Sequence, residues 1–98
     1  KNHDVIILDC VTVWLGNLLH HFEGDVEKIG HHVDGLINIS TEIAAELIIV
    51  TNEVGMGIVP DNPLSRKFRD LAGMLNQKLA AAATEVSLQV SGIPVKIK

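Results

Sequence analysis

The sequence predicts an α/β fold in which a mostly parallel β-sheet carries helices against its faces. Short runs of β-branched residues and leucine alternate with longer segments that repeat apolar residues at helical spacing. The first run, at 5–8, is apolar throughout, as expected of a strand buried on both faces of a parallel sheet. Helical segments separate it from the next run at 47–51, which indicates a crossover between parallel strands.

Length and composition fit one small domain without a disordered tail. The chain has 98 residues, 47% of them hydrophobic, and its aromatic residues are two phenylalanines and one tryptophan, so the core must be aliphatic. The formal net charge of −4 and the lack of a large basic cluster argue against a nucleic-acid partner. No apolar run is long enough to span a bilayer, so we expect a cytoplasmic protein.

The first half should hold two strands with helices between them. After the strand at 4–10, apolar residues at helical spacing predict a helix through Phe22, with Thr12 as its N-cap. Residues 24–35 are polar and glycine-bearing, and they are predicted to form a loop or the frayed start of the next helix. That helix should end near Glu46, before the second strand at 47–51.

The second half should begin with a long helix. Asn62 before Pro63 is the pattern of an N-cap followed by proline at the first helical position, and the helix should continue to residue 83. A third strand is predicted at 85–92 and a short fourth at 93–98, with the turn marked by glycine and proline.

Polar side chains follow the first two strands at the points where each strand ends. Asp9 ends the first, and Thr51, Asn52 and Glu53 follow the second. In parallel sheets, ligands gather at the carboxyl ends of the strands. An acid there commonly holds Mg²⁺, and an amide with a carboxylate can orient a hydroxyl or a metal-bound water. Alternatively, Asp9 is a helix-capping or surface carboxylate.

The segment after Glu53 is a glycine-rich loop that leads to the Pro63 helix. Gly55 and Gly57 allow the backbone to bend sharply or to approach a ligand closely. A plain turn does not require so long a stretch of mixed apolar and glycine residues, so we favour a functional loop over a simple connection.

Other polar residues give weaker indications. The pairs His20–His21 and His31–His32 lack the i, i+4 spacing of a zinc-binding helix and are expected to be solvated. Among the basic residues near the start of the Pro63 helix, Arg69 is nearest to the apolar seam and is the best candidate for a phosphate contact, the alternative being a solvated charge. Cys10 is expected to act as a small hydrophobic residue.

Three segments resemble one known family, the bifunctional adenosylcobinamide kinase / adenosylcobinamide-phosphate guanylyltransferases of cobalamin biosynthesis. They are "ILDCVTVWLGNLL" (7–19), "VTNEVGMGIVPDNPLSRKFRDLAGMLNQKLAAAATEV" (50–86) and "VSGIPVKIK" (90–98). Together they cover well over half of the chain, in the order in which the family has them.

The resemblance implies a three-layer, nucleotide-binding fold of the P-loop NTPase (RecA-like) type with a mostly parallel sheet. Residues 1–98 would be the C-terminal portion of that domain. It also implies a homotrimer that uses ATP and GTP as substrates, with Mg²⁺. Enzymes of the family phosphorylate the aminopropanol hydroxyl of adenosylcobinamide, and then transfer GMP to that phosphate through a guanylylated histidine.

Carried over residue by residue, the resemblance makes Asp9 the strand-end acid that contacts the nucleotide or its metal, and Asn52 and Glu53 the family's "NE" pair. We therefore expect Asp9 and Glu53 to be catalytic and Asp9 to be the metal ligand. Asp9, Thr51, Asn52 and Arg69 are expected to contact the nucleotide.

Two features of the family are missing from these residues. No GxxxxGK[ST] phosphate loop is present, and none of the five histidines lies in the family's histidine motif. In the family both features lie upstream, so we expect residues 1–98 alone to be inactive.

Two alternatives stay open. In one, the chain is a receiver-like signalling module in which Asp9 accepts a phosphoryl group, although it lacks paired acids near its start and a clear lysine at the end of the third strand. In the other, these residues serve only as a packing or trimerisation unit.

Overall fold

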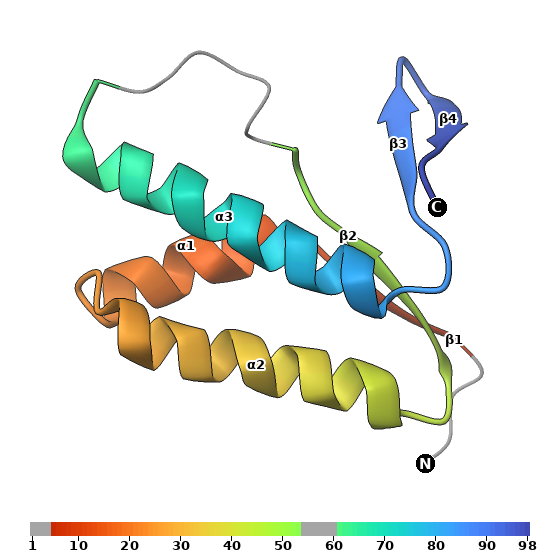
Figure 1. Ribbon diagram of the computed structural model, residues 1–98, viewed down its shortest axis with the longest axis horizontal. Coiled ribbons are helices and arrows are strands. Elements are labelled where there is room, and N and C mark those ends of the chain that lie inside the picture. Colours follow the sequence, from red (N-terminus) through yellow and green to blue (C-terminus); the bar gives the residue numbers. More distant parts are fainter. Residues whose placement is uncertain (1–4, 54–60) are drawn as a thin grey trace.

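The structure is a computed structural model that describes residues 5–53 and 61–98. It has mixed α/β architecture (Figure 1). The elements follow the order β1 (Val5–Asp9), α1 (Val11–His21), α2 (Val26–Glu42), β2 (Glu46–Val50), α3 (Pro63–Ala82), β3 (Ser87–Val90) and β4 (Ile93–Lys96). Among the described residues, no helix is both long enough and apolar enough to cross a membrane.

The strands β1 and β2 form a parallel pair, as the sequence predicts. Val5 pairs with Glu46 at one end, and Asp9 pairs with Val50 at the other. The helices α1 and α2 lie between the two strands in the chain, and they provide the crossover that a parallel pair requires. The carboxyl ends of both strands consequently lie at one edge.

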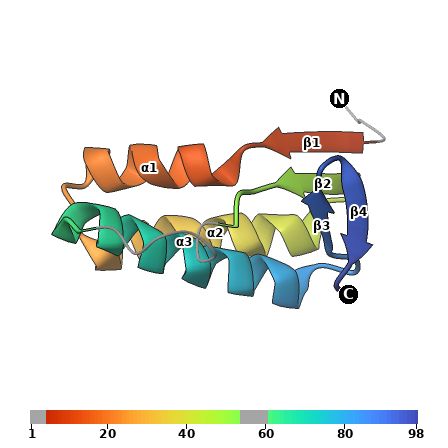
Figure 2. The ribbon, with the colours of Figure 1, turned by 90° about the horizontal axis from the view of Figure 1, so that it is seen from above.

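The core lies where the three helices meet the inner face of this strand pair. In Figure 2, β1 leads almost directly into α1, and α2 and α3 lie on the other side of β2. The largest fully buried side chains are Val11, Leu15, Ile29 and Leu75, and Leu8 and Ile49 of the strands pack against the core. The core is therefore aliphatic, as the composition predicts.

The opposite face of β1 and β2 is apolar and open to solvent in this structure. Ile7 is 66% exposed and Ile48 is 45% exposed. Both strands alternate between exposed and half-buried positions, because successive side chains of a strand point to opposite faces. Helices thus cover one face of the pair. A three-layer arrangement is not present among the described residues.

The start of α1 differs from the prediction. The N-cap is Cys10, without a side-chain cap hydrogen bond, and Thr12 lies inside the first turn, 4% exposed. Because β1 ends at Asp9, one residue is enough to pass from strand to helix. Thr12 is therefore free to make a tertiary hydrogen bond in place of a cap.

The segment predicted as a loop or a frayed start is the regular beginning of α2. Asp25 caps this helix, accepting hydrogen bonds from the backbone N–H groups of Glu27 and Lys28 at 3.1 and 3.3 Å. Ile29 and Val33 are buried, and their burial offsets the poor helix propensity of the glycines. The helix ends at Glu42, earlier than predicted, because the chain is already extended at Ile43.

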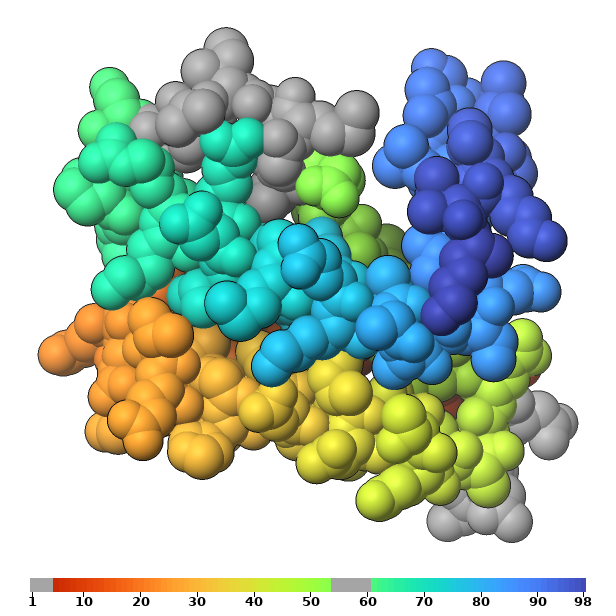
Figure 3. Space-filling view, in the orientation of Figure 1, coloured from red at the N-terminus to blue at the C-terminus, as the bar shows by residue number. Residues whose placement is uncertain are grey.

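The predictions for the second half are largely confirmed. Pro63 is the first residue of α3, and the Asn62 side chain accepts a hydrogen bond from Ser65 N–H at 2.7 Å. The strands β3 and β4 form an antiparallel hairpin, a separate sheet from β1 and β2. In Figure 3 the hairpin stands away from the rest of the surface.

Candidate functional site

The structure brings together the strand-end residues that the sequence singles out. Asp9 pairs with Val50, so it lies beside the point where β2 leads into Thr51, Asn52 and Glu53. All four of these polar residues are exposed. Asp9 follows the exposed positions of β1, and it therefore lies on the open face of the strand pair.

Behind this edge, hydrogen bonds join α1, β2 and α3. We call the residues involved the strand-end cluster: Cys10, Thr12, Thr51, Asn52 and Asn76. The Asn52 side chain donates from Nδ2 to Thr12 Oγ1 at 3.1 Å, and the Cys10 Sγ lies 2.8 Å from the same hydroxyl oxygen.

The second half of the cluster ties β2 to α3. The Thr51 hydroxyl donates to Asn76 Oδ1 at 2.7 Å, and Asn76 Nδ2 donates to the main-chain carbonyl of Asn52 at 3.0 Å. Residues from three separate parts of the chain are thereby held at one edge of the strand pair (Figure 1).

The thiol of Cys10, which the sequence predicts to act as a small hydrophobic residue, is half-buried and lies within hydrogen-bond distance of the Thr12 hydroxyl. Its pKa lies below the ordinary value of 9.0, chiefly because the Thr12 hydroxyl hydrogen-bonds to the sulfur. The backbone N–H groups of Thr12 and Val13 act in the same direction, and partial burial and the charge of Asp9 oppose it. Because Thr12 Oγ1 already accepts from Asn52, its own hydrogen is available for a thiolate at Cys10.

Neither Asn76 nor the tertiary role of Thr12 was predicted from the sequence. One indication was available in the sequence: Asn76 is a polar residue of low helix propensity directly after the buried Leu75 of a helix seam. The partners of Asn76 could not be found in this way, because they lie 24 and 25 residues away along the chain.

Arg69 lies on α3, half-buried, seven residues before Asn76. Seven residues are close to two helical turns, so the two side chains share one stripe of α3, separated along its axis by about 10 Å. The stripe runs from the strand-end cluster toward the start of the helix. Gly55 and Gly57 of the predicted functional loop lie outside the described residues.

A metal at this edge would have few protein ligands. Within residues 5–53 and 61–98, no group of three or more histidine, cysteine or acidic residues could hold a metal ion. One carboxylate, Asp9, nevertheless fits Mg²⁺, which keeps several waters and commonly takes one or two carboxylates together with substrate phosphates. Among the described residues, Asp9 is the carboxylate at the end of β1 that would supply such a ligand.

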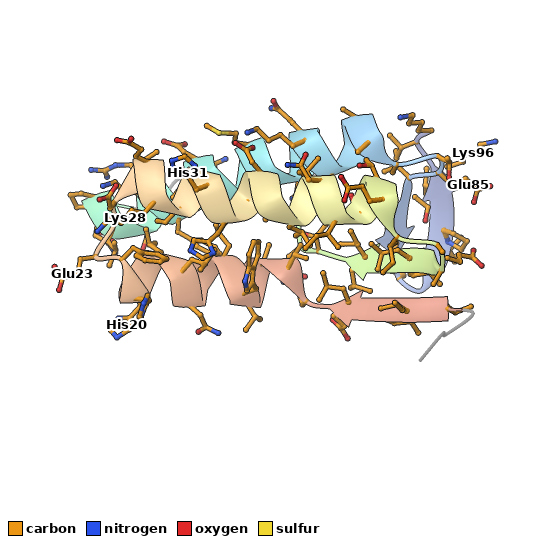
Figure 4. The ribbon with its side chains drawn as sticks, turned by 90° about the horizontal axis from the view of Figure 1, so that it is seen from below. His20, Glu23, Lys28, His31, Glu85 and Lys96 are labelled. Carbon is orange, nitrogen blue, oxygen red and sulfur yellow. The ribbon has the colours of Figure 1, made fainter. Side chains whose placement is uncertain are left out.

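The histidine pairs do not form a site with one another. Figure 4 shows His20 and His31 extending from different helices on different sides of the molecule. The ring of Phe22 lies 4.7 Å from that of His21 and 5.1 Å from that of His32. These two histidines therefore pack against the same aromatic side chain at the surface.

Comparison with known proteins gives a consistent family assignment. Residues 1–97 match the model of a family described as cobinamide kinase / cobinamide phosphate guanyltransferase. The chain is 47% identical to the bifunctional adenosylcobalamin biosynthesis protein CobU of Escherichia coli and 49% identical to CobU of Salmonella typhimurium, covering 98% and 97% of this chain. It is 36% identical to the corresponding protein CobP of Pseudomonas aeruginosa, over 95% of this chain.

The coverage of the relatives themselves is smaller. The chain spans 59% of the length of both CobU proteins and 53% of CobP. The match nevertheless extends along nearly all of the 98 residues, including both strand ends and the whole of α3. On this basis, the chain belongs to the cobinamide kinase / cobinamide phosphate guanyltransferase family.

Proposed function

We propose that the protein carrying this chain is a bifunctional enzyme of cobalamin biosynthesis. It phosphorylates adenosylcobinamide with a nucleoside triphosphate, ATP or GTP, and then transfers GMP from GTP to the resulting phosphate. Residues 1–98 form the C-terminal portion of its P-loop NTPase-like (RecA-like) domain, and the phosphate loop and the GMP-accepting histidine belong to the remainder of the protein. The supporting observation is the family match over 1–97.

The arrangement at the strand ends agrees with this activity. Phosphoryl and nucleotidyl transfer depend chiefly on positioning phosphates and neutralising their charge. The parallel register brings Asp9 beside the residues that follow β2, at the edge where α/β sheets bind ligands. The family match favours this function over a receiver-like module in which Asp9 would accept a phosphoryl group.

In the proposed site, Asp9 and Glu53 are catalytic and Asp9 is the protein ligand for Mg²⁺. The metal, when bound, would supply positive charge to the phosphate oxygens. Thr51 and Asn52 would orient the nucleotide from the end of β2. With its Nδ2 group engaged by Thr12, the Asn52 amide keeps Oδ1 as an acceptor toward a ligand. Arg69 would contact phosphate from α3.

We further propose a cytoplasmic homotrimer. The exposed apolar residues of the strand pair and of the β3–β4 hairpin support an assembly in which neighbouring subunits or the rest of the domain cover them. The alternative, in which these residues serve only for packing or trimerisation, predicts no loss of activity on changing Asp9 or Glu53.

The test uses the full-length protein with two conservative substitutions. Asp9→Asn and Glu53→Gln should each reduce ATP-dependent phosphorylation of adenosylcobinamide by about a hundredfold, because charge near the transferred phosphate is removed. Asp34→Asn and Glu85→Gln are matched controls at exposed positions away from the strand ends, and they should leave the rate unchanged. Covalent labelling of the wild-type protein by GTP tests the second activity.

The proposal fails if the wild-type protein neither phosphorylates adenosylcobinamide nor takes up label from GTP. It also fails in its residue assignment if Asp9→Asn retains the activity of Asp34→Asn. A receiver-like function would instead appear as labelling of Asp9 by a small phosphoryl donor without any nucleotide.

A further inference from the structure

Asn76 takes no part in the proposed chemistry, yet it makes two hydrogen bonds that connect α3 to Thr51 and Asn52, the residues that follow β2. It lies near the middle of α3, where an asparagine is a poor helix former. Its neighbours Leu75 and Leu79 are part of the core, and Asn76 itself is half-buried. Its amide group faces the end of β2, and it contacts two consecutive residues there.

The chemistry of these two bonds requires an amide. Asn76 Oδ1 accepts from the Thr51 hydroxyl at 2.7 Å, and Nδ2 donates to the Asn52 carbonyl at 3.0 Å. A carboxylate in the same place would keep the acceptor but would lose the donor, and it would set a negative charge against the Asn52 carbonyl oxygen. An aliphatic side chain of the same size would lose both bonds.

The effect of Asn76 passes onward through Asn52. With its carbonyl held by α3, the side chain of Asn52 reaches Thr12 on α1 at 3.1 Å and lies 3.7 Å from the Cys10 sulfur. Asn52 is thus fixed from both sides, by its main chain and by its side chain. Such double anchoring orders a ligand-binding amide before the ligand arrives, and it removes part of the entropy cost of binding.

We propose that Asn76 is a positioning residue, whose amide holds Thr51 and Asn52 so that Asn52 presents its Oδ1 atom at the open edge of the strand pair. This inference rests on the proposed function of that edge. Asn76 acts through Asn52 and does not itself contact the reacting groups.

The test compares Asn76→Asp with Gln77→Glu in the full-length protein. Gln77 is the next residue of α3, exposed and outside the strand-end cluster, so its substitution makes the same amide-to-acid change without touching Asn52. Asn76→Asp should lower kcat for phosphorylation of adenosylcobinamide about tenfold or more, as expected when a positioning contact is lost. Gln77→Glu should behave as wild type.

A second substitution separates positioning from a general structural effect. In the Asn52→Ala background, Asn76→Asp should cause little further loss of kcat, because its effect passes through Asn52. Full additivity of Asn52→Ala and Asn76→Asp, or equal activity of Asn76→Asp and Gln77→Glu, would overturn the inference.

A spectroscopic measurement keeps this test distinct from that of the proposed function. Asn76→Asp should shift and broaden the side-chain NH₂ resonances of Asn52 in the NMR spectrum of the full-length protein, and Gln77→Glu should not. A wild-type protein without transferase activity would contradict the proposed function alone. Unchanged Asn52 resonances in Asn76→Asp would contradict the positioning role, whatever the activity.

Discussion

The β1–β2 pair and the β3–β4 hairpin are each two strands long, but they are held in different ways. One face of the β1–β2 pair packs on the aliphatic core between the three helices, through Leu8 and Ile49. The hairpin contributes no residue to that core, and every residue of β4 is exposed. Lys98, beyond β4, ties the chain end to α3 by donating to the carbonyls of Ala80 and Ala81.

This difference separates local from tertiary stabilisation. An isolated two-stranded hairpin is marginally stable in water, because few of its apolar groups are removed from solvent. Its turn, Ser91–Gly92, has positive φ angles of 52° and 77°, as in the type I′ turns that match strand twist. The hairpin is thus determined mainly by its turn and its backbone pairing, and the β1–β2 pair by the core beneath it.

The largest effect should come from a cavity in the core. Leu75 is fully buried, so Leu75→Ala should lower the free energy of unfolding by about 2–5 kcal/mol. Val95→Ala in the hairpin removes a side chain that is 45% exposed, and it should cost less than about 1 kcal/mol. Urea denaturation followed by circular dichroism measures both. Equal losses would mean that the hairpin is buried in solution.

A smaller and local effect should follow a change in the hairpin turn. Gly92→Ala adds a Cβ at a φ angle of 77°, which costs about 1–2 kcal/mol, and it should accelerate amide exchange in β3 and β4 only. Gly30→Ala is the matched control: a Cβ there meets nothing within 4 Å, and the helix should become more stable by about 0.5–1 kcal/mol. Faster exchange in α1 or β1 of Gly92→Ala would show that the two regions unfold together.

The smallest effect concerns the polar edge of the β1–β2 pair, which the hairpin does not possess. Because the pKa of Cys10 is lowered, its alkylation rate should reach half-maximum below pH 9.0, and Thr12→Val should move that midpoint upward. The Cys10 thiol loses its proton at a lower pH in the folded protein than in the unfolded chain, so the free energy of unfolding should rise with pH between the lowered pKa and 9.0. This gain in stability should be lost as the pH falls through the lowered pKa.

The alkylation rate of Cys10 is measured at several pH values in a buffer that contains a chelator. Asn52→Ala serves as a second variant. Asn52→Ala removes the donor to Thr12 Oγ1 and the long contact of Asn52 Nδ2 with the Cys10 sulfur at 3.7 Å. It leaves in place the Thr12 hydroxyl, the chief cause of the shift, so its midpoint should move less than that of Thr12→Val. A midpoint unchanged by Thr12→Val would contradict the assigned cause of the shift.

The sequence predicts those elements whose ends have local chemical causes. Asn62 and Pro63 define the start of α3, because an N-cap side chain and a fixed proline φ act on adjacent residues. The parallel pairing of β1 and β2 follows from the two helical segments between them. The start of α2 was missed because Gly30 and Gly35 obscure a pattern that is stabilised by tertiary burial of Ile29.

The same reasoning accounts for what could be predicted of the site. Strand ends are recognisable in the sequence, so Asp9, Thr51 and Asn52 could be predicted to lie together at one edge of the strand pair, and the parallel register places them there. The roles of Thr12 and Asn76 depend on contacts with residues 24 to 40 positions away, and no local pattern reports such contacts. The proposed roles of all five site residues remain predictions: Asp9, Thr51, Asn52, Glu53 and Arg69.

The parallel register has a consequence for the order of folding. Thr12 and Asn52 are 40 residues apart in the chain, and they meet only after α1 and α2 have closed the crossover between β1 and β2. Contacts of such large sequence separation form late and slow the folding of a domain. The helices can therefore exist before the polar edge does, and competence to bind a ligand should be among the last properties that the newly made chain acquires.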